Sequence, residues 1–494
     1  MTRNVLFALF ALFAVPLSLS AGQPNVLFIT VDDMNADSLG VYDCPIPDTS
    51  PVLDNLAAEG MYFEHAHIQV PNCTPSRNVL QTGRYPQNNG VEGFYDVQVD
   101  FPLLPDLLKQ AGYRTGIWGK IVDTTPTSNY KWDKVVHSTG GKGSQKSDDN
   151  VYRLTKKFIN DSKAAGKPFY FVLNISDPHH PLFNSPASKK KGFDAFPPSR
   201  LFTKDEIVVP GFLPDIPKVR QDVTNYYNSV RRADDLAGAA LKALDDAGAR
   251  ENTIVMFLSD HGMPFPFAKT NLYHHSTRTP WIVRFPGMVQ PGSVDTEHMI
   301  SAIDFMPTIL ELCGVANPGG MDGTSFAPLL RGEKQSGRDK VFKEFHENAK
   351  GHRNPMRAVE TKRFGYIFNP WSNGQRAFRS ATLFSPTFKA MEKAARDNGS
   401  IDARLQHFKH RTVEEFYDYQ NDPDALNNLI DDPRYAKEVE KLRGALEAWM
   451  EDMGDVALEP FRNRHDPKAL AAFIKEQDAA SAARLASGMT RKRK

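Results

Sequence analysis

The sequence contains little cysteine and no excess of either charge. Three cysteines among 494 residues are too few for a disulfide framework. The net charge is +1, from 60 basic and 59 acidic side chains, so no overall field favours nucleic acid or an anionic membrane surface. After the first twenty residues, no stretch is apolar enough to span a bilayer. The length of the chain predicts a large domain with a smaller one.

The N-terminal segment has the pattern of a secretory signal peptide. Arg3 supplies a positive charge, residues 5–15 are apolar, and small residues precede a cleavage point near Ala21. A membrane anchor is the alternative, but the apolar run is short and Pro16 interrupts it. We therefore expect residues 1–21 to be removed and the mature protein to be exported, to a periplasm or outside the cell.

Strand-like and helix-like patterns alternate through the first two-thirds of the chain. Residues 26–31 are a run of β-branched and aromatic side chains, as buried parallel strands require. Further along, the patterns predict a helix over 103–110, strands over 115–118 and 169–175, a helix over 221–247 and a strand over 254–258. This βαβα order predicts a mostly parallel central sheet with helices on both faces.

The pattern changes after a stretch rich in Gly, Ser and charge at residues 331–338. Short strand-like runs follow at 341–345, 357–361 and 365–368, and a helix is predicted over 433–450. Their spacing indicates a small antiparallel sheet packed by one helix. The predicted organisation is an α/β domain at 22–335, an α+β subdomain at 336–460 and a helical or disordered tail at 461–494.

Polar side chains follow four of the predicted strands. They are Asp32 and Asp33, Lys120, Asp177-Pro178-His179, and Asp260 with His261. A single Asp-Asp pair is more often a turn or a helix cap. In a parallel sheet, however, ligands bind outside the carboxyl ends of the strands, so four such ends together predict a site. Three carboxylates with few thiols suit a hard divalent cation, calcium more readily than magnesium.

The most specific motif is Cys73-Thr74-Pro75-Ser76-Arg77. An isolated cysteine is more often a small buried hydrophobe or half of a disulfide. Here the motif continues through Leu80, Thr82, Gly83 and Arg84, in the pattern C-x-P-S-R-x-x-L-x-T-G-R. With it the chain resembles the sulfatase family, in which this pattern directs oxidation of the cysteine to formylglycine. The resemblance implies an alkaline-phosphatase-like fold, and a formylglycine-generating enzyme as a partner in maturation.

The resemblance also assigns roles to individual residues. It implies that Ca²⁺ is bound by Asp32, Asp33, Asp260, His261 and the modified Cys73. It implies that Arg77 holds the formylglycine, Lys120 contacts it and the sulfate, His179 protonates the leaving group and Lys269 binds sulfate. In this family one hydroxyl of the formylglycine hydrate attacks sulfur, and loss of the second proton then expels sulfate.

One position departs from the family pattern. The family usually has a His two residues after the Lys of the Gly-Lys pair, where it helps to release sulfate, but here Val122 stands at that position. Because Val cannot move a proton, either another group replaces the His or the second step is altered. The candidates that the sequence offers, without a ranking, are His65, His67, His274 and His275.

Segments of both domains are similar to the sulfamidase branch of this family, the heparan N-sulfatases. The similar segments are residues 259–273, 355–359 and 385–388. The same likeness slightly favours His346, Glu347 and Arg357 as residues that bind the sugar. The alternative for each is an ordinary surface charge, since pocket residues cannot be located from sequence.

The leading hypothesis is therefore a calcium-dependent sulfatase that acts on a sulfated carbohydrate, N-sulfoglucosamine or a related sugar. An O-sulfatase that acts on a marine or host polysaccharide is the alternative. A phosphonate or phosphodiester hydrolase would use a similar modified cysteine. From another class, Val122 permits a non-catalytic protein that binds sulfated glycans.

Overall fold

The computed structural model of the chain describes residues 22–489. The predicted signal peptide at residues 1–21 lies outside the described residues, so its removal stays a prediction. Among the residues that are described, no helix is both long enough and apolar enough to cross a membrane.

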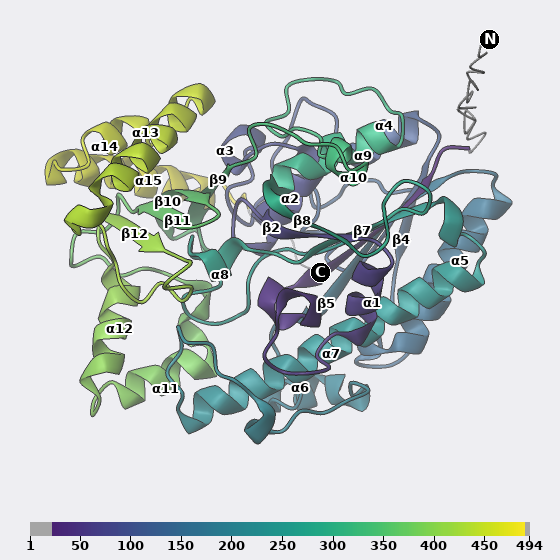
Figure 1. The fold of residues 1–494 in the computed structure, drawn as a ribbon, viewed down its shortest axis with the longest axis horizontal. Coiled ribbons are helices and arrows are strands. Elements are labelled where there is room, and N and C mark those ends of the chain that lie inside the picture. Colours follow the sequence, from purple (N-terminus) through teal and green to yellow (C-terminus); the bar gives the residue numbers. More distant parts are fainter. Residues whose placement is uncertain (1–21, 490–494) are drawn as a thin grey trace, which may run out of the picture.

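The larger of two sheets has eight strands in the order β4-β3-β5-β1-β6-β7-β2-β8 (Figure 1). The strands are β1 (Asn25–Asp32), β2 (Met61–His67), β3 (Arg114–Trp118), β4 (Lys134–Val136), β5 (Phe169–Pro178), β6 (Thr253–Ser259), β7 (Trp281–Arg284) and β8 (Ser293–Ser301). Strand β7 is antiparallel to both of its neighbours, and the other pairs are parallel. The predicted mostly parallel sheet is confirmed.

Alternate side chains of β1 enter two different hydrophobic cores, because successive residues of a strand point to opposite faces. Leu27 and Ile29 belong to one core and Val26 and Phe28 to the other. The first core contains side chains of α1 (Pro51–Ala58), α5 (Asp148–Ala164) and α7 (Pro217–Asp246); the second contains side chains of α2 (Cys73–Thr82), α4 (Leu104–Gln110) and α9 (Phe305–Leu312). Helices therefore cover both faces, as predicted (Figure 1).

The smaller sheet is antiparallel, in the order β12-β11-β10-β9. Its strands are β9 (Lys340–Glu347), β10 (Arg353–Thr361), β11 (Phe364–Phe368) and β12 (Glu414–Asp418). The predicted helix is α13 (Ala436–Met453), and its Trp449 ring stacks on Phe342 of β9 at 5.2 Å between centroids. The antiparallel sheet and its helix are thus confirmed, while β12 was not predicted.

Four further helices follow in the C-terminal part of the chain. They are α11 (Pro386–Ala394), α12 (Gly399–His410), α14 (Leu458–Arg462) and α15 (Pro467–Ala486). Ser481 of α15 donates a 2.6 Å hydrogen bond to the Gly351 carbonyl, in the turn between β9 and β10. The remaining α-helices are short: α3 (Pro86–Asn89), α6 (Pro186–Lys191), α8 (His274–Thr277) and α10 (Ala327–Leu330).

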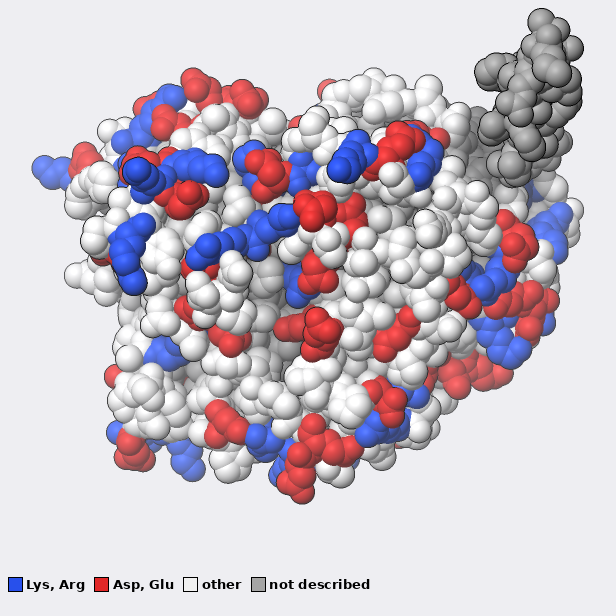
Figure 2. Space-filling view, in the orientation of Figure 1, with Lys and Arg blue, Asp and Glu red and all other residues white. Residues whose placement is uncertain are grey.

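The sequence patterns did not predict β2, β7 and β8, which extend the large sheet on one side. Strand β8 reads SVDTEHMIS and five of its nine residues are partly or fully exposed, so it lacks the continuous apolar run of a central parallel strand. On the face shown in Figure 2, acidic and basic side chains intermingle, in agreement with the balanced charge.

Candidate active site

The predicted metal ligands meet at the carboxyl end of the large sheet. Strands β1 and β6 are parallel neighbours with Val31 opposite Ser259, and this register places the residues that follow each strand side by side. Ligand atoms of Asp32, Asp33, Cys73 and His261 lie within 4.8 Å of one another, and all four residues are buried. The structure therefore assembles a cluster from three distant segments of the chain.

Asp33 and Asp260 are tied together directly. The backbone N–H of Asp33 donates a 3.1 Å hydrogen bond to Oδ1 of Asp260. Asp33 adopts a left-handed backbone with φ 72°, and Lys120, which follows β3, does so with φ 46°. Non-glycine residues rarely adopt this region, and such strain is concentrated at functional sites.

Cys73 is the first residue of α2 and is 4% exposed. Its Sγ lies 3.3 Å from Nε2 of His261, 3.5 Å from Oδ1 of Asp32 and 3.7 Å from Nζ of Lys269. Burial, together with the Asp32 carboxylate, raises the pKa of the Cys73 thiol well above its ordinary value. The thiol itself is therefore protonated near neutral pH and is a poor nucleophile.

Arg77 lies one turn after Cys73 and is buried. Its Nη2 is 2.9 Å from Oδ2 of Asp260, and its Nη1 donates hydrogen bonds of 2.8 Å to Thr30 and 2.6 Å to Asn174. These contacts fasten the first turn of α2 to β1, β5 and the loop after β6. The guanidinium thus places the Cys73 side chain against the carboxylates.

Two lysines pair with the two adjacent aspartates. Lys120 forms an ion pair with Asp32, and Lys269 contacts both oxygens of Asp33 at 2.7 and 2.8 Å. Burial alone would raise the pKa of Asp32, but Lys120 and other nearby cations outweigh it and hold that pKa well below its usual range. Both aspartates are therefore ionised, and both ammonium groups lie beside Cys73.

His179 follows β5 and is half-buried. Its Nδ1 donates a 2.6 Å hydrogen bond to the His180 carbonyl, which leaves Nε2 as the nitrogen that can exchange a proton. Burial and the nearby Lys269 ammonium lower the pKa of His179 to about 3. The preceding Asp177 is fixed by Arg232 at 2.8 Å and by Lys146 at 2.8 Å, so this turn is anchored from two sides.

The donor set fits a hard divalent cation. Three carboxylates converge with one imidazole, and oxygen ligands are those that Ca²⁺ prefers. Oδ2 of Asp32 is paired with Lys120, and Oδ2 of Asp260 lies 2.9 Å from Nη2 of Arg77, so cations of the chain already balance part of the buried negative charge. The carboxylates keep further lone pairs with which they could bind a cation. The imidazole of His261 is the softest ligand of the set.

The three residues proposed for sugar binding lie in or beside buried ion pairs. Arg357 pairs with Asp455 at 2.8 Å, and Nδ1 of His346 is 3.3 Å from Oε1 of Glu92. Glu347 pairs with Arg484 of α15, while its carbonyl accepts a 3.1 Å hydrogen bond from Asn72, next to Cys73. Their contact with substrate stays a prediction.

The histidines considered as substitutes at Val122 have other partners. His67 and His274 lie 3.6 and 2.6 Å from Glu360, and His275 is 3.2 Å from Asp424. Within the part of the chain that the structure describes, none of these three contacts Cys73. Instead, Asp123 accepts a 2.8 Å hydrogen bond from Thr74. Sequence reasoning missed Asp123, although it directly follows Val122.

All three cysteines are free thiols, so Cys44 and Cys313 are not joined in a disulfide.

Comparison with known proteins agrees with this arrangement. Residues 24–315, which include the whole metal and nucleophile cluster, match the family model described as Sulfatase. The chain belongs to the sulfatase family. Residues 260–375 of this sulfatase also match the model described as N-sulphoglucosamine sulphohydrolase, C-terminal.

Relatives of this sulfatase include N-sulphoglucosamine sulphohydrolase of Homo sapiens. It is 30% identical over 473 residues, which cover 89% of this chain and 92% of the human protein. An ulvan-active sulfatase of Formosa agariphila is 26% identical and covers 88% of this chain and 76% of its own length. The solved structure of a 2-O GAG sulfatase superposes with TM-score 0.65 at 21% identity, over 91% of this chain and 96% of the other. The protein is thus a hydrolase of sulfate esters or sulfamates.

Proposed function

We propose that this sulfatase is calcium-dependent, carries formylglycine at position 73, and removes sulfate from a sulfated sugar, with N-sulfoglucosamine as the favoured substrate. One observation carries the proposal: Cys73 lies within 4.8 Å of the ligand atoms of Asp32, Asp33 and His261, with the Lys269 ammonium at 3.7 Å. Residue 73 lies between carboxylates, which would bind the cation, and an ammonium, which would bind the sulfate. A nucleophile at this position would therefore be close to both.

Formylglycine at position 73 would supply a hydrate hydroxyl for attack on sulfur. A cation held by Asp32, Asp33, Asp260 and His261 would supply positive charge to the sulfuryl oxygens. The resident cations of the chain add to that charge. Lys120 and Lys269 remain protonated because Asp32 and Asp33 raise their pKa values above the ordinary value, so both can stabilise the negative charge that develops during sulfuryl transfer.

The leaving group requires a proton, and His179 is the group proposed to supply it. Its Nδ1–H is held by the His180 carbonyl, so only Nε2 can deliver a proton. With its pKa lowered to about 3, His179 is neutral near neutral pH when the site lacks substrate. A bound sulfate would bring negative charge to the site and favour the protonated imidazolium, so substrate binding itself would charge the acid.

The N-sulfated sugar is favoured by the match of residues 260–375 and by the 30% identical human relative. The ulvan-active relative favours an O-sulfated polysaccharide instead. Both hypotheses use the same nucleophile and cation and differ only in the sugar and in the atom that carries the sulfate.

A panel of substrates decides between them. Mature protein, co-produced with a formylglycine-generating enzyme, is incubated with N-sulfoglucosamine, glucosamine 6-sulfate and sulfated oligosaccharides of an algal polysaccharide, and free sulfate is measured by ion chromatography. Release from N-sulfoglucosamine, and none from a Cys73→Ala variant, is the expected result. Release from O-sulfated sugars alone overturns the N-sulfated preference. Binding without release, in protein whose formylglycine is verified by mass spectrometry, supports a binding protein.

A further inference from the structure

A second depression begins where the mouth of the active site ends. The first depression, of about 320 Å³, is lined by His179, Lys269 and residues 381–386. The second, of about 590 Å³, lies beside it and is lined by residues 350–352, the loop 375–379 and α15. The two meet at a single contact, because Nζ of Lys350 lies 4.7 Å from the ring centroid of Phe384.

Phe384 is unusual for its exposure. Its side chain is 70% exposed, the largest value among the exposed large hydrophobic side chains of residues 22–489. A single exposed apolar side chain is ordinary by itself, but this ring lines the first depression together with His179 and Lys269. Such a ring offers a flat apolar face to the C–H groups of a sugar ring. A sugar has an apolar face and polar groups at its edge, and the site likewise combines an aromatic ring with charged side chains.

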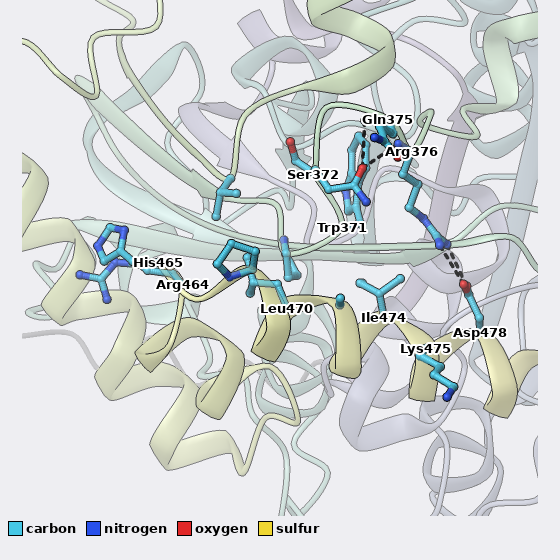
Figure 3. A pocket seen from close by; sticks show the side chains of 15 residues that line it. Trp371, Ser372, Gln375, Arg376, Arg464, His465, Leu470, Ile474, Lys475 and Asp478 are labelled. Carbon is cyan, nitrogen blue, oxygen red and sulfur yellow. Dashed lines mark hydrogen bonds and ion pairs between the residues drawn. The ribbon is translucent and has the colours of Figure 1, made fainter.

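Two of the positive charges that line the second depression have no ion-pair partner among the described residues. Lys350, His352 and Arg379 are exposed on its rim, and neither Lys350 nor Arg379 forms an ion pair with any described residue. In contrast, Arg376 is neutralised by Asp478 of α15 at 2.8 Å. Figure 3 shows this pair, which separates the second depression from a further cavity beside Trp371 and Ile474. The free charges thus lie on the side of the active site.

The loop 375–379, which carries Arg379, is fastened at its C-terminal end. The backbone of Arg379 donates to Asn354 at 3.0 Å and accepts from Asn348 at 2.7 Å, which ties it to β10 and to the β9–β10 turn. The Ser380 hydroxyl is 2.8 Å from that of Thr270, the residue after Lys269. The distance between the aromatic ring and the sulfate-binding lysine is therefore set by the fold, as a positioned subsite requires.

We infer that the second depression is a subsite for a second, anionic sugar of the substrate. Its ring would lie on Phe384, and its carboxylate or sulfate would contact Lys350 and Arg379. The inference rests on the proposed function and narrows it, because the preferred substrate becomes a sulfated sugar still linked to a uronate or to another sulfated residue. A single sulfated sugar would occupy only the first depression.

The test compares two substrates with the same reactive sulfate, one a single sugar and one a disaccharide with a uronate. The variants are Phe384→Ala and the charge reversals Lys350→Glu and Arg379→Glu. The ratio of kcat/KM for the disaccharide to kcat/KM for the single sugar is expected to fall about tenfold in each variant, through KM. In the wild-type protein the ratio should also fall with rising salt, because exposed charges are screened.

Lys468→Glu is the matched control. Lys468 is exposed at the start of α15, forms no ion pair within residues 22–489 and lines neither depression, yet its reversal changes the net charge equally. Its ratio should equal that of the wild-type protein. An unchanged ratio in the three subsite variants, or an equal fall in the control, overturns the subsite.

Failure of the proposed function is recognised separately. If mature wild-type protein releases sulfate from neither substrate, the proposed activity is wrong, and calorimetric binding of the disaccharide then decides the subsite alone. Weaker binding to Lys350→Glu and Arg379→Glu, with unchanged binding to Lys468→Glu, supports the subsite. Equal binding to all variants overturns it.

Discussion

The ammonium of Lys269 lies 3.7 Å from the thiol of Cys73, although 196 residues separate them in sequence. The contact exists because α2 begins, and the loop after β6 passes, at the same edge of the large sheet. It brings positive charge to the position where the modified side chain and a sulfate would meet.

Replacement of Lys269 tests this contact. In Lys269→Met, kcat/KM should fall about 100-fold or more, because a positioned charge on the transferred group is removed from a buried site. Sulfate release under steady-state conditions is the measurement. Lys468→Met serves as the control for loss of a surface lysine. A fall of less than threefold in Lys269→Met, with formylglycine content unchanged, would contradict the role of Lys269.

Removal of the cation should affect stability as well as activity. Three buried carboxylates repel one another without it, so chelation should lower the midpoint of thermal unfolding and abolish sulfate release. Ca²⁺ should restore both more effectively than Mg²⁺, because the ligands come from dispersed segments and Mg²⁺ demands a near-ideal octahedral geometry. Asp32→Asn should make the unfolding midpoint independent of Ca²⁺. Activity that survives exhaustive chelation would refute the metal site.

The Lys343–Glu360 ion pair predicts a pH dependence of stability. Burial would raise the pKa of Glu360, but Lys343, His67 and His274 outweigh it and the net shift is downward. A carboxyl group whose pKa is lower in the folded than in the unfolded protein stabilises the folded state. This stabilisation is complete above the pKa of the unfolded protein, about 4.3, and is lost as the pH falls towards the pKa of the folded protein. In Glu360→Gln the free energy of unfolding should therefore be lower by about 3 kcal/mol at pH 7, and by less below pH 4.

Urea unfolding at pH 7 and pH 3.5 measures this difference. The control is Glu297→Gln, which breaks an exposed pair with Lys362 and should cost less than about 1 kcal/mol at either pH. A destabilisation of Glu360→Gln that does not change with pH would show that charge at Glu360 is not its cause.

Val122 allows a gain-of-function test. If release of sulfate from the enzyme limits turnover because no His stands there, Val122→His should raise kcat, because a positioned general base contributes about 10²–10⁴-fold. Rapid-mix kinetics of the wild-type protein should then show covalently bound sulfate that accumulates. Fast release without accumulation, together with an unchanged kcat in the variant, would show that another group already performs this step.

The sequence predicted the central strands well because they are buried on both faces. Residues 26–31, 169–175 and 254–258 are almost entirely apolar, with Thr30 and Asn174 as the exceptions, and they lie within β1, β5 and β6 respectively. Strands β2 and β8, which lie at one end of the sheet, contain polar residues, so their pairing depends on neighbours that no local pattern encodes.

For the candidate site, the motif and the strand ends indicated the chemistry, while the contacts needed the structure. Asp123 and Phe384 belong to no sequence motif. They became candidates only because the structure places Asp123 beside Thr74 and Phe384 beside Lys350. Likewise, nothing local to Arg357 predicts Asp455 as its partner, 98 residues further along the chain.

The sequence by itself determined the kind of reaction, since the residues around Cys73 and the acidic strand ends specify their chemistry locally. Only the tertiary structure decided which charges are compensated. Arg357 is neutralised by Asp455, which lies between α13 and α14, and Arg376 by Asp478 of α15, whereas Lys350 and Arg379 form no ion pair with any residue of 22–489. The physical reason is that electrostatic interactions depend on distance in space, and the packing of α15 against the smaller sheet fixes that distance.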